Sequence, residues 1–152
     1  MGYIMNLRKK VGHDPIISVG STVLVFNEKK ELLLNLRSDT NTWGIPGGGK
    51  ELNETLEECA IRELKEETNL EVDDLELVTV LSGKEYYFKY PNDDEVDCII
   101  TLYQVKDYNG KLKSNDGEST KLKFFSFDSM PELESRAKAI IDKIKNEDIK
   151  LR

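Results

Sequence analysis

The chain has 152 residues, of which 38% are apolar and 34% charged, so its apolar side chains suffice to pack one domain over residues 1–152. A net charge of −7 argues against a binder of nucleic-acid polymers, which would present a basic face. No apolar run reaches the roughly 18 residues of a membrane-spanning helix, and the N-terminus does not have the charge order of a secretory leader. We therefore expect a cytoplasmic protein without membrane contact, in which Cys59 and Cys98 stay reduced.

Apolar patterning in the first third of the chain predicts strands over residues 16–26 and 31–36. The polar residues 27–30 separate them as a turn, so we expect the two strands to pair with each other. A polar loop over residues 38–42 precedes Trp43 and the run Pro46-Gly47-Gly48-Gly49. Because three consecutive glycines favour unusual backbone dihedral angles, we expect this run to be irregular.

Residues 55–68 form the clearest predicted helix. Thr55 and Glu58 have the spacing of a capping box, and Asn69 suits a left-handed helix end. Further strands are expected at residues 75–81, 86–90, 96–105 and 122–127, with turns at 91–94, 109–110 and 116–117. A second capping box, Ser129 with Glu132, predicts a C-terminal amphipathic helix from about residue 130. This order predicts an α/β (α+β) fold in which helices pack on a mixed sheet.

The helix over residues 55–68 carries acidic side chains on its apolar stripe. On a helical wheel Glu63 and Glu67 fall in the middle of the stripe that begins at Leu56, and Glu66 falls on its edge. A solvated acidic face is one interpretation, and it requires the last turns to leave the core. The other is a functional site in which the carboxylates bind hard cations such as Mg²⁺ or Mn²⁺. The adjacent glycine run, which can bring backbone close to a ligand, favours the site.

The same residues carry a family resemblance. Gly48, five residues, Glu54, seven residues and then residues 62–70 (RELKEETNL) resemble the signature box of the Nudix hydrolases. The matching identities are Gly48, Glu54, Arg62, Glu63, Glu66 and Glu67, with Leu64 and Leu70 in the aliphatic positions. Asn69 departs from the glycine usual there. The resemblance implies the Nudix fold, a mixed β-sheet sandwiched between α-helices.

By this resemblance the chain is a divalent-metal-dependent hydrolase. It would cleave the pyrophosphate bond of a nucleoside diphosphate linked to another moiety, such as ADP-ribose, a nucleotide sugar or a nucleoside triphosphate. The expected metal ligands for Mg²⁺ or Mn²⁺ are Glu63, Glu66, Glu67, Glu54 and the carbonyl of Gly47. Arg62 would orient a glutamate, although a surface salt bridge is the alternative. The general base would be Glu63 or Glu118.

Weaker candidates for contact with the substrate come from residue type and position. Gly48 would bring the backbone close to it. Arg37, which follows a strand, suits phosphate, although a surface arginine is an equal alternative. Tyr87, in an aromatic run, could stack on a base or serve sheet packing. Lone His13 is expected at the surface.

Two questions stay open at this stage, catalysis and oligomeric state. A Nudix domain without catalysis would act as a nucleotide-binding sensor, but the complete set of box glutamates favours an enzyme. The expected partner is a small nucleotide-derived molecule, and the sequence leaves open whether the protein forms a homodimer.

Overall fold

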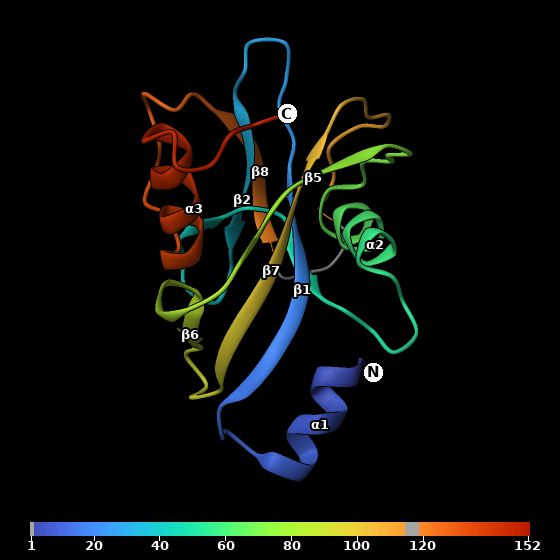
Figure 1. Ribbon diagram of the computed structural model, residues 1–152, viewed down its shortest axis with the longest axis vertical. Coiled ribbons are helices and arrows are strands. Elements are labelled where there is room, and N and C mark those ends of the chain that lie inside the picture. Colours follow the sequence, from blue (N-terminus) through green and yellow to red (C-terminus); the bar gives the residue numbers. More distant parts are fainter. Residues whose placement is uncertain (1, 115–118) are drawn as a thin grey trace.

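The computed structural model describes residues 2–114 and 119–152, and within them two sheets and three α-helices (Figure 1). The larger sheet has the order β4-β1-β7-β5, with β6 also paired to β7, and the smaller has the order β3-β2-β8. The strands are β1 (Ile16–Leu24), β2 (Leu32–Arg37), β3 (Trp43–Gly44), β4 (Gly47–Gly49), β5 (Leu75–Leu81), β6 (Tyr87–Lys89), β7 (Glu95–Val105) and β8 (Ser119–Phe125). The helices are α1 (Tyr3–Val11), α2 (Leu56–Thr68), α3 (Ser135–Lys145) and a short 3₁₀ turn at Lys84–Tyr86.

Strands β1 and β7 are parallel and their other pairings are antiparallel, so the sheet is mixed, as predicted. Helices α2 and α3 lie on opposite sides of the strands, which confirms the predicted sandwich (Figure 1). None of the described helices has the length and apolar character needed to cross a membrane.

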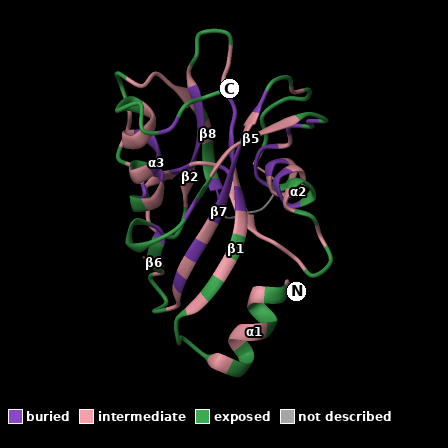
Figure 2. Cartoon of the chain, in the orientation of Figure 1, coloured by how far each residue is buried: buried purple, intermediate pink, exposed green. Residues whose placement is uncertain are grey.

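Two hydrophobic cores lie between the strands and the helices that pack on them. Neighbouring residues on β1 and β2 point to opposite faces, so Leu24 and Leu34 join the core against α3, whereas Val23 and Leu33 join the core against α2. Ile140 completes the first core, while Ala60 and Leu64 of α2 complete the second. Figure 2 shows buried residues concentrated on the central strands. Because both faces are covered here, residues 23–25 and 32–34 are continuously apolar and fully buried.

The predicted pairing of the first two strands holds only beside their turn, where Phe26 and Leu32 form an antiparallel bridge. Both edges of β1 are occupied, since Gly20, Ser21 and Thr22 pair with β4 while the whole strand pairs with β7. Strand β2 belongs to the other sheet. The two strands meet only beside their turn, where the Leu33 N–H donates to the Val25 carbonyl at 2.9 Å.

The glycine run is regular structure, which corrects a second expectation. Gly47 to Gly49 form β4, antiparallel to β1, and none of the three has a positive φ. Close packing is the reason for glycine here. A Cβ on Gly20 would overlap the Gly48 carbonyl oxygen, and a Cβ on Gly47 would overlap the Ser21 carbonyl oxygen. The backbones of β1 and β4 can approach this closely only because these positions are glycine and have no Cβ.

Helix α2 begins and ends as predicted. The Thr55 hydroxyl accepts from the Glu58 N–H at 3.0 Å, and the Glu58 carboxylate accepts from the Thr55 N–H at 2.9 Å. Asn69 ends the helix in the left-handed region, with φ of 69°.

Replacing Thr55 with alanine removes one half of this capping box. We expect the free energy of unfolding to fall by about 1 kcal/mol, because the Glu58 N–H then has no side-chain acceptor. Chemical denaturation with urea measures the loss. A Thr55→Ser variant, which keeps the hydroxyl, serves as the control. An unchanged midpoint in Thr55→Ala would contradict the capping role.

The C-terminal helix starts later than its sequence pattern predicts. Glu134, not Ser129, is the N-cap of α3. Residues 132–134 are instead extended along β3, where the Trp43 N–H donates to the Glu132 carbonyl at 2.9 Å and the Glu134 N–H donates to the Trp43 carbonyl at 2.8 Å. This long-range pairing prevents the second capping box and places Glu134 at the helix start. Helix α1 was not predicted, since none of its residues is buried and its pattern is weak.

Candidate active site

The C-terminal half of α2 presents its glutamates at graded depth. Glu67 is buried, with 8% of its surface exposed, the side chain of Glu63 is 15% exposed, and that of Glu66 is 52% exposed. The carboxylates of Glu63 and Glu67 are therefore turned inward, as the helical wheel predicted. Burial of charge is costly unless polar groups compensate it.

Arg62 is the centre of the acidic cluster. Its Nε and Nη2 donate to the two carboxylate oxygens of Glu54 at 2.6 and 2.9 Å. Its Nη1 donates to Glu63 at 2.8 Å and lies 3.3 Å from Glu66, and Nη2 also donates to the Gly49 carbonyl at 3.0 Å. A planar guanidinium with a bidentate partner fixes direction as well as distance. Arg62 thus connects Glu54, in the loop before α2, with β4 and with the acidic turns of α2. These contacts go beyond a surface salt bridge.

The hydrogen bonds of Arg62 shift the pKa values of the groups around it. The hydrogen bond from Arg62 lowers the pKa of Glu54 to about 2, against the opposing effect of burial. The same bond to Glu54 raises the pKa of Arg62. Both groups are therefore charged at neutral pH. Burial raises the pKa of the nearby Cys59 thiol to about 11, so this cysteine is a neutral packing residue.

Strand β4 lies directly against the acidic side chains. The Gly47 N–H donates to Glu67 Oε2 at 2.9 Å, and the Glu51 N–H donates to Glu54 Oε1 at 3.0 Å. A Cβ on Gly48 would overlap the Glu63 carboxylate. The missing side chain at Gly48 is thus the space that Glu63 fills, and it sets where that carboxylate lies.

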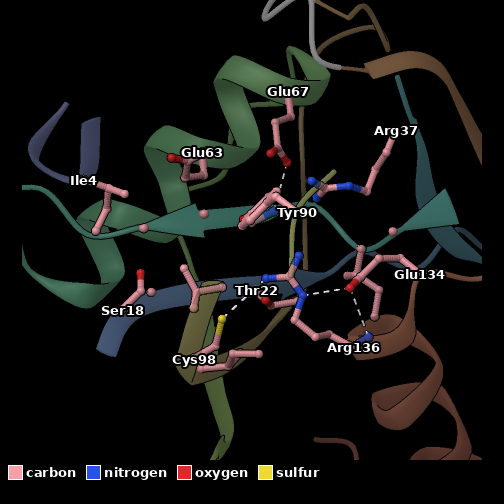
Figure 3. A pocket seen from close by; sticks show the side chains of 18 of the residues that line it. Ile4, Ser18, Thr22, Arg37, Glu63, Glu67, Tyr90, Cys98, Glu134 and Arg136 are labelled. Carbon is pink, nitrogen blue, oxygen red and sulfur yellow. Dashed lines mark hydrogen bonds and ion pairs between the residues drawn. The ribbon is translucent and has the colours of Figure 1, made fainter. Parts of the chain in front are cut away.

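The glutamates open onto a cavity of about 810 Å³. Figure 3 shows Glu63 and Glu67 projecting from α2 at the top of the view, with Arg37 and Tyr90 drawn next to Glu67 and with Glu134 and Arg136 below them. Helix α1 contributes Ile4, whose Cγ1 would lie 3.6 Å from a Cβ added at Gly49. A cavity of this size accommodates a ligand of nucleotide dimensions.

The structure brings most of the predicted site residues to this cavity. Those that line it are Arg37, Gly47, Gly48, Glu63, Glu66 and Glu67, with Glu54 joined to them through Arg62. Arg37 pairs with Asp39, Nη2 to Oδ2 at 2.8 Å. Glu118 lies outside the described residues.

Tyr87 is placed elsewhere. Its hydroxyl donates to Glu95 Oε1 at 2.9 Å on the edge of the sheet, and it is absent from the residues that line the cavity. Tyr90, from the same aromatic run, lines the cavity instead. Strand alternation decides this, because Tyr86, Phe88 and Tyr90 face inward while Tyr87 and Lys89 are exposed. His13 is at the surface as expected, 2.7 Å from Asp94.

Sequence reasoning missed Asn35, Glu134 and Arg136, which also line the cavity. Asn35 is a lone amide in an apolar strand, and this is a signal that could have been noticed. The predicted helix start near residue 130 places Glu134 and Arg136 inside the helix. The sequence pattern therefore does not show that Glu134 is its N-cap and that Arg136 is in its first turn.

The donor set fits a hard divalent cation in chemistry. The described residues contain no group of three His, Cys, Asp or Glu side chains already arranged around one ion position. Instead Arg62 compensates the carboxylates of Glu54, Glu63 and Glu66. All the side-chain donors are carboxylate oxygens beside backbone carbonyls, which suits Mg²⁺ or Mn²⁺ rather than softer metals.

Comparisons with known proteins show the family to which the chain belongs. Residues 17–144 match the NUDIX domain, so the chain belongs to the Nudix family of hydrolases. A putative 8-oxo-dGTP diphosphatase of Bacillus subtilis is 45% identical over 49 residues, which are 32% of this chain and only 33% of that protein. An ADP-ribose pyrophosphatase of Methanocaldococcus jannaschii is 29% identical over 86% of this chain and 70% of its own length. The crystal structure of a MutT NUDIX hydrolase from Burkholderia pseudomallei superposes with a TM-score of 0.70 at 19% identity, covering 85% of this chain and 98% of that one.

Proposed function

We propose that the protein is a divalent-metal-dependent pyrophosphohydrolase that cleaves the diphosphate of a nucleoside diphosphate linked to another moiety. One observation carries the proposal: Glu63 and Glu67 face a cavity of about 810 Å³ beside β4, and Arg37 lines that same cavity. Substrates such as ADP-ribose, a nucleotide sugar or a nucleoside triphosphate fit this chemistry. The relatives named as pyrophosphatases support it.

Each residue has a role that its geometry supports. Glu63, Glu66 and Glu67 would hold Mg²⁺ or Mn²⁺, with Glu54 and the Gly47 carbonyl as further ligands. Bound there, such an ion neutralises phosphate oxygens and lowers the pKa of water. Arg62 holds the carboxylates of Glu54 and Glu63 in position by charge-assisted hydrogen bonds. Arg37 would donate to phosphate, and Glu63 would accept the proton of the attacking water.

The acidic protein needs this arrangement to bind a polyphosphate. With a net charge of −7, it repels anions at long range, and Arg37 already has Asp39 as a partner. A cation held by the α2 carboxylates would reverse the local potential where the diphosphate binds. A cytoplasmic location and a monomeric or dimeric state belong to the same proposal.

A panel of nucleoside diphosphate derivatives tests the function. We expect release of a nucleoside monophosphate in the presence of Mg²⁺ or Mn²⁺ and none with a chelator. Chromatography of the products also shows which P–O bond breaks. A protein that binds nucleotides tightly but hydrolyses no member of the panel with either metal would be the sensor that the sequence left open, and the enzymatic proposal would fail.

A further inference from the structure

Two guanidinium groups share one pair of aromatic rings at the side of the cavity away from Ile4 and Ser18 (Figure 3). Arg37 Cζ lies 5.8 Å from the ring centres of both Phe88 and Tyr90, and Arg136 Cζ lies 4.2 and 5.8 Å from them. Both contacts are within the range of cation–π attraction. We call Asn35, Arg37, Tyr90 and Arg136 the distal wall of the cavity.

Arg136 is held in one orientation. Its Nε donates to Glu134 Oε1 at 2.8 Å and its Nη1 to Cys98 Sγ at 3.4 Å, while the backbone N–H groups of Arg136 and Ala137 donate to the same carboxylate of Glu134. Its side chain is only 14% exposed. In the parts of the chain that the structure describes, no group accepts from Nη2. Arg136 therefore presents a fixed set of donors to the cavity.

Asn35 presents a hydrogen-bond acceptor, whereas Arg136 presents donors. The residue is 6% exposed, and its Nδ2 donates to Ser119 Oγ at 2.8 Å. Its buried Oδ1 has no hydrogen-bond partner among residues 2–114 and 119–152. Buried amide oxygens are rarely left without a donor, so this one is explained if a ligand supplies it. Gly44 leaves the neighbouring space open, since a Cβ there would lie 3.4 Å from Oδ1 and 3.5 Å from Arg37 Cδ.

We propose that Arg136 and Asn35 select the nucleobase, and that they favour a ring with a carbonyl next to an N–H, as in guanine, over a purine without a carbonyl, such as adenine. The inference rests on the proposed function, because it concerns the group attached to the diphosphate. The guanidinium of Arg136 can only donate, so it needs an acceptor, and a carbonyl oxygen serves best. Asn35 Oδ1 can only accept, so it needs an N–H. Adenine can also donate to Asn35 through its amino group, but it offers Arg136 only a ring nitrogen, whereas guanine offers the carbonyl and ring-nitrogen pair that arginine binds best.

The test compares guanosine and adenosine diphosphate sugars that carry the same sugar. We expect wild-type kcat/KM to favour the guanosine compound by about 10- to 100-fold, the usual discrimination of a good arginine–base contact. Arg136→Lys keeps the charge but loses the planar fork, so the preference should fall by about tenfold, mainly through KM. Lys138→Gln, an exposed change on the same helix, should leave the ratio unaltered. A wild-type preference for adenosine, or a preference in Arg136→Lys as large as that of the wild type, would overturn the proposal.

A binding measurement separates this inference from the proposed function. Guanosine and adenosine monophosphate are titrated by calorimetry without metal, so the result does not depend on hydrolysis. Asn35→Asp keeps an acceptor oxygen and should retain the preference for guanosine monophosphate, whereas Asn35→Leu should lose it. Melting temperatures identify any variant that fails to fold. If the wild type hydrolyses nothing yet binds guanosine monophosphate more tightly, only the enzymatic proposal fails. Equal affinity for both monophosphates refutes the distal wall as the selecting element.

Discussion

Replacing Glu67 with glutamine is expected to lower kcat by on the order of 100-fold or more while the melting temperature stays within about 2 °C of wild type. Glutamine keeps an oxygen that accepts from the Gly47 N–H, so the link between α2 and β4 survives. It removes the negative charge that a divalent cation requires, and even residues behind the metal ligands cost about 10- to 100-fold when changed. Steady-state phosphate release with Mg²⁺, together with thermal melts, measures both effects.

Two matched variants make this result specific. Glu66→Gln should also abolish hydrolysis, although Glu66 is half exposed and contributes little to packing. Glu71→Gln removes the same charge from an exposed carboxylate that pairs with Lys65, and it should leave kcat unchanged. Retained activity in both Glu66→Gln and Glu67→Gln would refute the assignment of the metal ligands.

Adding one methyl group at Gly48 is expected to reduce activity strongly without unfolding the protein. The new Cβ would overlap the Glu63 carboxylate, which is the end of a flexible side chain and can move away. Activity should therefore fall by about 100-fold in Gly48→Ala, because the carboxylate leaves the position that Arg62 fixes. Kinetic assays and urea denaturation of the same preparation distinguish the two effects.

The neighbouring glycines supply the controls. Gly49→Ala places its Cβ 3.6 Å from Ile4 Cγ1 and 3.7 Å from Ser18 Oγ, which are ordinary contacts, so activity should persist. Gly47→Ala meets the Ser21 carbonyl oxygen, which is backbone and cannot rotate away, so this variant should lose about 1–3 kcal/mol of stability. Equal activity in Gly48→Ala and Gly49→Ala would show that the position of Glu63 is unimportant.

Local rules predicted the parts of the structure that are local. The capping box of Thr55, the left-handed Asn69 and the inward stripe of Glu63 and Glu67 depend on residues within a few turns of each other, and the structure has all of them. The carboxylate cluster could therefore be proposed before its surroundings were known.

Long-range pairing accounts for the errors. Gly47 to Gly49 become a strand only because glycine at position 20 lets β1 approach them. The start of α3 moves to Ser135 because residues 132–134 are paired with Trp43. The distal wall combines residues from β2, from α3 and from the loop after β6, so no sequence spacing connects Asn35, Tyr90 and Arg136. Sequence periodicity does not encode such contacts.

Mn²⁺ binding tests the central claim most directly. Calorimetric titration of Mn²⁺ into the protein, in the presence of a non-hydrolysable diphosphate analogue, should show uptake by the wild type and at least tenfold weaker uptake by Glu67→Gln. An absence of uptake by the wild type, or an identical isotherm for the two proteins, would contradict the view that the inward carboxylates of α2 bind the cation that holds the diphosphate.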